Sequence, residues 1–217
     1  MIVTIASYKG GVGKTTTAVH LAAYLSQKAP TLLVDGDANR SATAWANRGA
    51  LNFLDDGSTA EGAIRGGAFG FRVVDERQGV KYARDYEHIV IDTEARPDEE
   101  DLRALVEGCD LLIIPTTPDA LALDALMLTV KELKSLGADR YRILLTIIPP
   151  RPSHDAEDAA FALNQAEIPM FHSVIRRLVA FQKAALSGVL VHAAKDSRAA
   201  DAWKDYVCVG AELFNGK

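Results

Sequence analysis

The chain has 217 residues, 48% of them hydrophobic, which predicts a single domain over residues 1–217 with a sizeable core. Its 24 Lys and Arg are outnumbered by 29 Asp and Glu, so the net charge of −5 excludes a bulk positive field, and any nucleic-acid or lipid partner must be met by a local patch. The two cysteines, Cys109 and Cys208, are spaced too widely for a disulfide framework or a zinc site. Because the sequence shows neither a signal peptide nor an apolar run of roughly 20 residues, we expect a cytoplasmic protein without membrane contact.

Short apolar runs rich in Val, Ile and Leu alternate with longer stretches of helical periodicity, a pattern typical of a parallel sheet with helices on both faces. The expected strands are residues 2–7, 31–35, 71–75, 88–92, 110–115 and 141–148, with a short edge strand within 168–172. The expected helices lie between the first two strands, near 41–48, 98–107, 119–136 and 154–165, and through much of 175–213. Asp98 and Asp119, each directly after a proline, are expected to cap helix N-termini, and the glycine-containing stretch 54–70 is expected to be a loop.

The first predicted strand is followed by the glycine-rich sequence KGGVGKTT at residues 9–16, and a helix is expected directly after it. The backbone N–H groups of such a loop, together with the helix N-terminus, can bind the phosphates of a nucleotide. Lys14 would reach the β and γ phosphates, and the Thr15 hydroxyl would ligate Mg²⁺. The strict motif is not met, because Tyr8 occupies the position of its first glycine. The predicted contacts to the nucleotide are Lys9, Gly10, Gly11, Val12, Gly13, Lys14, Thr15 and Thr16. We therefore predict an α/β P-loop NTPase with a mostly parallel, twisted sheet of about seven or eight strands.

Three carboxylates follow other predicted strands, Asp35 and Asp37 after the second and Asp92 after the fourth. In an open parallel sheet, ligands gather at the carboxyl ends of the strands, so all three should lie near the phosphate loop. Asp92 follows an apolar strand, as expected of an aspartate that holds Mg²⁺ through water. Asp37 is the candidate metal contact that would also orient or polarise the attacking water, and Asp35 is expected to support the outer shell of the metal.

These motifs resemble the ParA/MinD family of deviant Walker A ATPases. KGGVGKTT resembles the family's Walker A box, VDGDANRSATAW its second motif and YEHIVIDT its Walker B motif, and the weaker matches PTTPDALALDAL and VIRRLVAFQKAALSGVLV extend the resemblance over nearly the whole chain. The resemblance implies ATP and Mg²⁺ as cofactors and identifies Lys9 as the signature lysine, which reaches the phosphates bound by the partner subunit of an ATP-dependent homodimer. A cation supplied in trans would stabilise charge on the transferring phosphoryl group, as an arginine finger does. The family's base site suggests Ile148 and Pro149 as adenine contacts.

Two features depart from the family pattern. Ala38 stands where proline is usual, and DTEARP lacks the small residues and prolines that often follow the Walker B Asp-Thr pair. Both departures bring the geometry of the nucleotide-sensing switch into question. An altered switch could slow hydrolysis without harming ATP binding.

Three branches of the family can be compared on their residues. The iron protein of nitrogenase needs cysteines at the dimer face, and Cys109 and Cys208 lie outside the expected motifs, which excludes that branch. A MinD-type membrane ATPase needs a basic amphipathic C-terminal helix, whereas DAWKDYVCVGAELFNGK carries Asp205 and Glu212, which argues against it. DNA partition remains, in a protein of the small ParA type.

A local excess of positive charge near the C-terminus fits that branch. Between His172 and Lys204 the sequence has two carboxylates and six cations, namely Arg176, Arg177, Lys183, Lys195, Arg198 and Lys204. This basic strip is expected to bind nucleoid DNA without sequence preference and in a strongly salt-sensitive way. Dimerisation would join two strips into one bivalent surface.

The resemblance implies a cycle in which ATP binding, dimerisation on nucleoid DNA, partner-stimulated hydrolysis and release move or position a cargo. The partner would be a ParB-like or McdB-like adaptor. The stretch DGDANRSATAWANRG is similar to the carboxysome-positioning McdA branch of the family. Three alternatives remain: a P-loop ligase or small-molecule kinase of the dethiobiotin-synthetase type, which would not need a lysine in trans, a MinD-like membrane ATPase, and an ATP-sensing scaffold without turnover.

Overall fold

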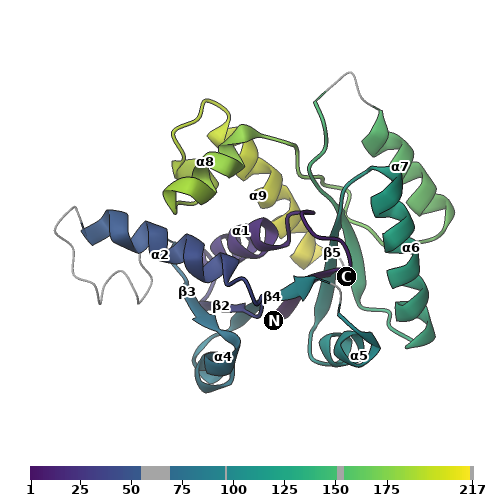
Figure 1. The fold of residues 1–217 in the computed structure, drawn as a ribbon, viewed down its shortest axis with the longest axis horizontal. Coiled ribbons are helices and arrows are strands. Elements are labelled where there is room, and N and C mark those ends of the chain that lie inside the picture. Colours follow the sequence, from purple (N-terminus) through teal and green to yellow (C-terminus); the bar gives the residue numbers. More distant parts are fainter. Residues whose placement is uncertain (55–68, 96, 151–153, 216–217) are drawn as a thin grey trace.

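The computed structural model describes residues 1–54, 69–95, 97–150 and 154–215, and its centre is a six-stranded parallel sheet (Figure 1). The strands lie in the order β3-β2-β4-β1-β5-β6. Their bounds are β1 Ile2–Ser7, β2 Thr31–Asp35, β3 Arg72–Asp75, β4 His88–Ala95, β5 Leu111–Thr116 and β6 Tyr141–Leu145. The register pairs Asp92 with Ile5 on one side and with Asp35 on the other, so two of the predicted acidic residues lie at one sheet edge. The α/β fold is therefore confirmed.

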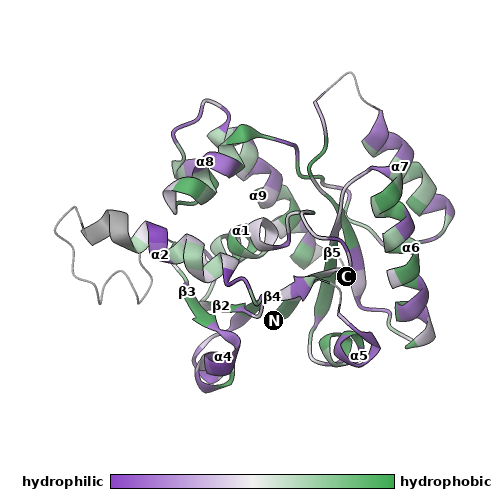
Figure 2. Ribbon diagram, viewed as in Figure 1, coloured by the Kyte–Doolittle hydropathy of each residue, from purple (hydrophilic) through white to green (hydrophobic). Residues whose placement is uncertain are grey.

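Helices cover both faces of the sheet, and most of them alternate with the strands along the chain. The helices are α1 Lys14–Ser26, α2 Ser41–Leu54, α4 Glu76–Tyr82, α5 Glu99–Glu107, α6 Ala120–Ser135, α7 Asp155–Gln165, α8 Val179–Ser187 and α9 Ala199–Asn215, with short 3-10 turns η1 Ala83–Asp85 and η2 Val191–Ala193. α1, α2, α8 and α9 lie on one face, while α5, α6 and α7 lie on the other (Figure 1). Figure 2 shows the hydrophobic strands enclosed between these layers.

Alternation along single strands explains how both faces are buried. In β5, Ile113 packs into the core beneath α1 and α9, whereas its neighbours Leu112 and Ile114 pack with α6 and α7. All three side chains are buried, so the strand is apolar on both faces, as parallel strands between two helical layers are. This burial explains why the strands could be located as continuous apolar runs.

Two expectations about the strands need correction. In the described residues the sheet has six strands, fewer than the predicted seven or eight, because the stretch 168–172 contributes only an isolated bridge from Met170 to Ile143. The predicted strand 141–148 ends at Leu145, and Ile147 then adopts a left-handed backbone with φ of 55°. Most of the loop expected at 54–70 lies outside the described residues. The helix α4, which the sequence did not predict, is capped by Asp75.

The long helical stretch expected at 175–213 is two helices, α8 and α9, separated by η2. α8 ends at Gly188, whose φ of 67° is left-handed, and a side chain there would meet the backbone nitrogen of Gly49 at 2.1 Å. Two side chains of α2 reach the same region, because Trp45 Nε1 donates to the Val189 carbonyl and Arg48 Nε to the Ala185 carbonyl. The end of α8 is thereby attached to α2.

Both predicted helix caps are confirmed. The Asp98 carboxylate accepts from the backbone N–H of Asp101 at 2.8 Å, and Asp101 returns the bond to form a capping box. The Asp119 carboxylate accepts from the Ala122 N–H at the start of α6. Because a cap uses only groups within four residues, it can be predicted from local sequence.

Candidate functional site

The glycine-rich loop lies between β1 and α1 and opens onto a cavity of about 740 Å³. Gly11 and Gly13 have φ values of 78° and 86°, a left-handed conformation that favours glycine. The Thr146 hydroxyl donates to the Val12 carbonyl at 2.8 Å, which attaches the loop to the end of β6. The predicted phosphate-contacting residues that line the cavity are Gly10, Gly11, Gly13, Lys14, Thr15 and Thr16. The loop geometry therefore suits a bound polyphosphate.

Two charged side chains of opposite sign are buried at the base of this loop. Lys14 is only 8% exposed, and Asp92 is 0% exposed. Both carboxylate oxygens of Asp92 are buried without a hydrogen-bond partner among the described residues. Burial raises the pKa of Asp92 to about 7, and the Asp35 and Asp37 charges add to the rise, whereas Thr15 and Lys14 oppose it. A buried carboxylate without a donor is costly, so this site favours a cation or a proton.

The residues present fit Mg²⁺ at this position. A magnesium ion prefers oxygen ligands, keeps several waters, and is usually held in nucleotide sites by one or two protein oxygens together with phosphates. The Thr15 hydroxyl is close enough to the Asp92 carboxylate to oppose the rise in its pKa, although the two do not meet in hydrogen-bond geometry, and Thr15 lines the cavity. When bound, the metal would supply charge neutralisation between the phosphates and Asp92.

Asp35 and Asp37, which the sequence grouped together, have different surroundings. Asp35 is 0% exposed, and its carboxylate accepts hydrogen bonds from the N–H and the hydroxyl of Thr43 and from the Asp37 N–H. These contacts hold the first turn of α2, so its oxygens are occupied by protein donors. Asp37 is half-buried and lines the cavity, and one of its oxygens accepts from the Asn39 backbone and side-chain N–H groups. Among the described residues that line the cavity, Asp37 is therefore the carboxylate that a ligand can contact directly, whereas Asp92 lies behind the lining.

The two segments that depart from the family pattern, one with Ala38 and the other with Glu94, contact each other. The Ala38 backbone N–H donates to the Glu94 carboxylate at 3.1 Å. A proline at position 38 would have no N–H to donate. The contact joins the loop after β2 to the end of β4, and it depends on both unusual residues.

Lys9 does not line the cavity. Its Nζ lies 2.8 Å from Asp119 Oδ1, and its side chain is 36% exposed. Hydrogen bonds from Lys9 and from the Thr117 hydroxyl lower the pKa of Asp119 to about 2. The preceding residue, Tyr8, donates its hydroxyl to Glu132 on the same helix, α6. These two contacts attach the mouth of the phosphate loop to α6 and its N-cap residue, and the sequence did not reveal either contact.

The predicted adenine contacts lie beside the phosphate cavity. Ile148 and Pro149 line a neighbouring cavity of about 620 Å³ that shares Arg176, Arg177 and Leu178 with the first. The apolar wall of the phosphate cavity instead comes from helices that sequence reasoning did not connect with it, through Trp45, Ile175, Leu178, Phe181 and Tyr206. No local signal marks these residues, because they approach the loop only when α2, α8 and α9 pack on α1.

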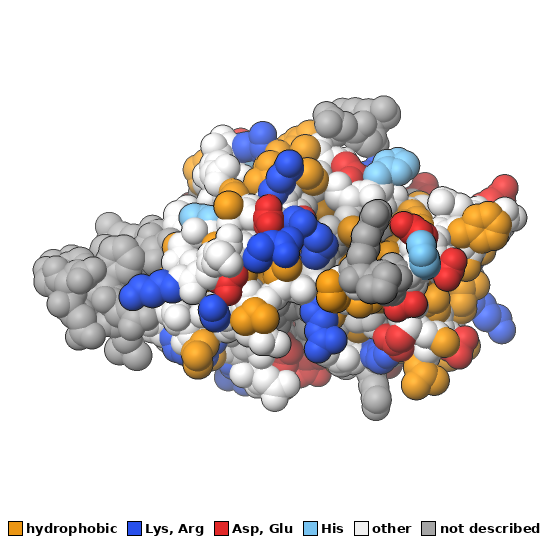
Figure 3. All heavy atoms as spheres, turned by 90° about the horizontal axis from the view of Figure 1, so that it is seen from above, with side chains coloured by type: hydrophobic (Ala, Val, Ile, Leu, Met, Phe, Trp, Pro, Cys, Tyr) orange, Lys and Arg blue, Asp and Glu red, His pale blue; other side chains and the backbone are white. Residues whose placement is uncertain are grey.

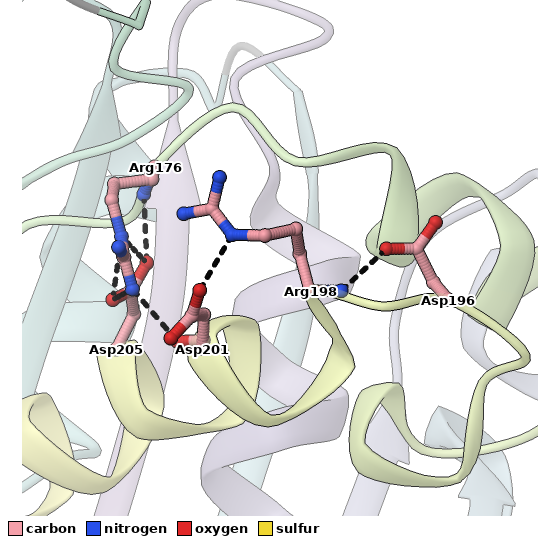
Figure 4. Close-up of polar contacts among 5 residues, drawn as sticks. All are labelled: Arg176, Asp196, Arg198, Asp201 and Asp205. Atoms are coloured by element: carbon pink, nitrogen blue, oxygen red, sulfur yellow. Dashed lines mark hydrogen bonds and ion pairs between the residues drawn. The ribbon is translucent and has the colours of Figure 1, made fainter.

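Half of the predicted basic strip is engaged in ion pairs (Figure 4). The Arg176 guanidinium lies 2.7 Å from Asp205, and Arg198 Nε lies 2.5 Å from Asp201. Lys183 pairs with Asp196 at 2.8 Å. On the face in Figure 3, positive and negative side chains accordingly lie together near the middle.

The other three cations of the strip are Arg177, Lys195 and Lys204. Their side chains are exposed and form no ion pair within the described ranges. The excess positive charge of the strip is therefore concentrated on three residues, because an ion pair leaves less charge available for phosphate groups. Among the described residues, none of the helices combines the length and apolarity needed to cross a membrane.

Comparison with known proteins agrees with this geometry. Residues 3–191 match the family described as CobQ/CobB/MinD/ParA nucleotide binding domain. The chain is 35% identical over 217 residues to the maintenance of carboxysome distribution protein A of Gloeobacter kilaueensis, covering 98% of this chain and 93% of the relative.

Solved structures share the fold. A putative plasmid partition protein from Borrelia burgdorferi bound to AMPPNP superimposes with a TM-score of 0.73 at 20% identity, over 100% of this chain and 99% of that one. An ATP complex of a McdA variant from Cyanothece has a TM-score of 0.71 at 19% identity, over 99% and 96% of the two chains. At these identities the likeness establishes the fold alone.

Proposed function

Because this chain belongs to the CobQ/CobB/MinD/ParA family of nucleotide-binding domains, we propose that it is an ATPase that dimerises with ATP and positions a cargo on nucleoid DNA. The observation that carries the proposal is the pair of unpartnered carboxylate oxygens of Asp92, buried beside Lys14 and Thr15 at the foot of the glycine loop. A site built only for stability would have paired these oxygens. A site that receives Mg²⁺ with a nucleotide leaves them open.

The described residues divide the work of hydrolysis. The loop N–H groups from Gly10 to Gly13 and the Lys14 ammonium bind the phosphates and orient the γ-phosphoryl group. Thr15 and, through water, Asp92 would hold Mg²⁺, which would supply charge neutralisation at the phosphates. Asp37, at the cavity wall, orients the attacking water and accepts its proton as the reaction proceeds.

Lys9 acts on the nucleotide of the partner subunit. In the isolated chain its ammonium is held by Asp119, at the exposed mouth of the loop and outside the cavity. An exposed pair of this kind contributes at most about 1 kcal/mol, so a partner's phosphates compete with it easily. Dimerisation transfers the lysine from the Asp119 carboxylate to that phosphate group, which couples ATP binding to assembly.

The DNA contact is made by Arg177, Lys195 and Lys204, the exposed cations of the basic strip, and two strips act together in the dimer. The carboxysome distribution relative supports a protein body as the cargo and an McdB-like adaptor as the partner that stimulates hydrolysis. A ParB-like adaptor with a plasmid or chromosome cargo is the other form of the same proposal. Both predict a nucleoid-associated protein.

One experiment tests these steps together. DNA gel shifts and sedimentation are run without nucleotide, with ADP and with ATP plus Mg²⁺, on the natural chain and on Lys9→Ala. We expect ATP-dependent dimerisation and DNA binding in the natural chain, and neither in Lys9→Ala, which remains a folded monomer. Equal DNA binding with and without ATP would contradict the proposal, and phosphate release stimulated by a small metabolite instead of DNA plus adaptor would favour a ligase or kinase.

A further inference from the structure

A buried histidine lies directly behind the phosphate loop. His20 is on α1, one helical turn after Thr16, and is 0% exposed. Its Nδ1 lies 2.7 Å from the Thr16 carbonyl oxygen, and its Nε2 lies 3.1 Å from the Val191 backbone nitrogen. Because a carbonyl only accepts and an N–H only donates, these two contacts define one tautomer, with the proton on Nδ1 and the lone pair on Nε2. Burial lowers the pKa of His20 to about 4, so the ring is neutral near pH 7.

The ring also contacts the aromatic wall of the nucleotide cavity. Tyr206 of α9 stacks on it with ring centroids 4.9 Å apart and an angle of 13°. Trp45 of α2 and Phe181 of α8 meet it edge to face, each at 5.6 Å. All three aromatic residues line the cavity that the phosphate loop opens onto. His20 is therefore the common neighbour of three helices that enclose the nucleotide.

We propose that His20 is a positioning residue for nucleotide binding, which sets the aromatic wall and the Val191 turn at a fixed place relative to the phosphate-binding turn of α1. The inference rests on the proposed ATP site and adds to it a link between that site and η2. Four residues after Val191 comes Lys195, one of the exposed cations of the basic strip. When ATP orders the first turn of α1, His20 transmits that order to the segment that carries this cation.

The location of its partners distinguishes His20 from a histidine that only fills space. Any buried histidine needs partners for its ring nitrogens, but here one partner lies on the same helix and the other, Val191, is 171 positions away in the chain. An apolar residue of similar size would keep the aromatic contacts but leave the buried Val191 N–H without an acceptor. The hydrogen bond to Val191 is thus the part of the arrangement that can be tested separately.

Two substitutions test the roles of the two ring nitrogens of His20 separately. The amide of Asn in His20→Asn lies near the Nδ1 position and is too short to reach Val191, whereas the longer amide of Gln in His20→Gln lies near Nε2 and can accept from the Val191 N–H. The affinity for a fluorescent ATP analogue with Mg²⁺ is measured for both. We expect His20→Gln to stay within about twofold of the natural chain and His20→Asn to bind about tenfold more weakly, as the loss of one buried hydrogen bond implies.

Amide hydrogen exchange gives a local readout that packing alone would not change. In the natural chain and in His20→Gln, ATP with Mg²⁺ should slow exchange both in the loop at 10–16 and in the segment 189–195. In His20→Asn only the loop should respond. A response of the 189–195 segment in His20→Asn equal to that in His20→Gln would overturn the inference.

A variant of the donor residue, Val191, tests the same hydrogen bond if His20→Asn folds poorly. Val191→Pro removes the donor itself at the first position of η2, where proline is tolerated and Leu190 already has the extended backbone that must precede it. We expect Val191→Pro to reproduce the loss of affinity, and the double variant to be no weaker than either single one. Additive losses would overturn the proposed link. If ATP left exchange of the loop amides in the natural chain unchanged, the proposed ATP site itself would be refuted. If ATP slowed exchange in the loop of the natural chain but not in the segment 189–195, only the role of His20 would be refuted.

Discussion

The buried Asp92 carboxylate predicts an unusual dependence of stability on pH. The pKa of Asp92 is raised from 3.8 to about 7, chiefly by burial. An acid whose folded-state pKa lies above its unfolded value stabilises the fold below the unfolded pKa and loses that contribution as pH rises through the folded pKa. A shift of about three pKa units corresponds to about 4 kcal/mol, present as a cost at pH 8 and mostly relieved near pH 4. The metal-free protein should therefore lose stability from Asp92 between about pH 4 and pH 7.

Asp92→Asn isolates this contribution, because the amide has nearly the same shape and does not ionise. Urea unfolding of the natural chain and the variant at pH 5 and pH 8, both with EDTA, gives two differences in unfolding free energy. We expect the variant to gain about 3 kcal/mol relative to the natural chain between these two pH values, since all other groups cancel in the comparison. Millimolar Mg²⁺ with ATP should stabilise the natural chain at pH 8 and have much less effect on the variant. A difference that is the same at pH 5 and pH 8 would refute the assignment of a buried, uncompensated charge to Asp92.

Three further predictions concern separate parts of the molecule. Asp119→Asn can still cap α6 and should release Lys9. We expect it to lower the protein concentration needed for ATP-dependent dimerisation in sedimentation by no more than about thirtyfold, because each of the two exposed pairs in a dimer contributes at most about 1 kcal/mol; a higher required concentration would show that the pair assists assembly. Gly188→Ala should cost more than about 2 kcal/mol in urea unfolding, because its Cβ would clash with the α2 backbone and its φ is left-handed; an unchanged midpoint would contradict that contact. Lys195→Ala combined with Lys204→Ala removes four cations from the dimer and should reduce the slope of log affinity for DNA against log salt by up to about 4 while leaving the melting temperature unchanged, and an unaltered slope would remove both residues from the DNA surface.

The sequence alone determined the elements whose causes are local. The glycines at 10, 11 and 13 and the Lys14–Thr15 pair lie within one short segment, so their role in holding a phosphate could be predicted from spacing. Mostly apolar runs located the six strands, because strands buried between two helical layers have few polar positions, such as Thr4 in β1. The caps Asp98 and Asp119 were predicted for the same reason, since a cap and its N–H partner are three residues apart.

Only the tertiary structure decided which of these residues have partners. Asp35 ends β2 and Asp92 lies beside it within β4, yet Asp35 is bonded to the first turn of α2 while Asp92 has no hydrogen-bond partner among the described residues. The pairing of Lys9 with Asp119 joins residues 110 positions apart. No local pattern contains this information, because it depends on how the strands and helices pack.

Helix packing also decided which predictions for the C-terminal region were correct. Six cations in the sequence indicated a basic strip, but helix packing places Asp205 against Arg176 and so reduces the available charge. Nothing near His20 in the sequence distinguishes it from an ordinary core residue, and its hydrogen bond to Val191 arises only when η2 packs against α1. Short-range chemistry therefore predicted where a nucleotide would bind, whereas long-range packing determined which charges remain unpaired among the described residues and how the phosphate loop is connected to the rest of the protein.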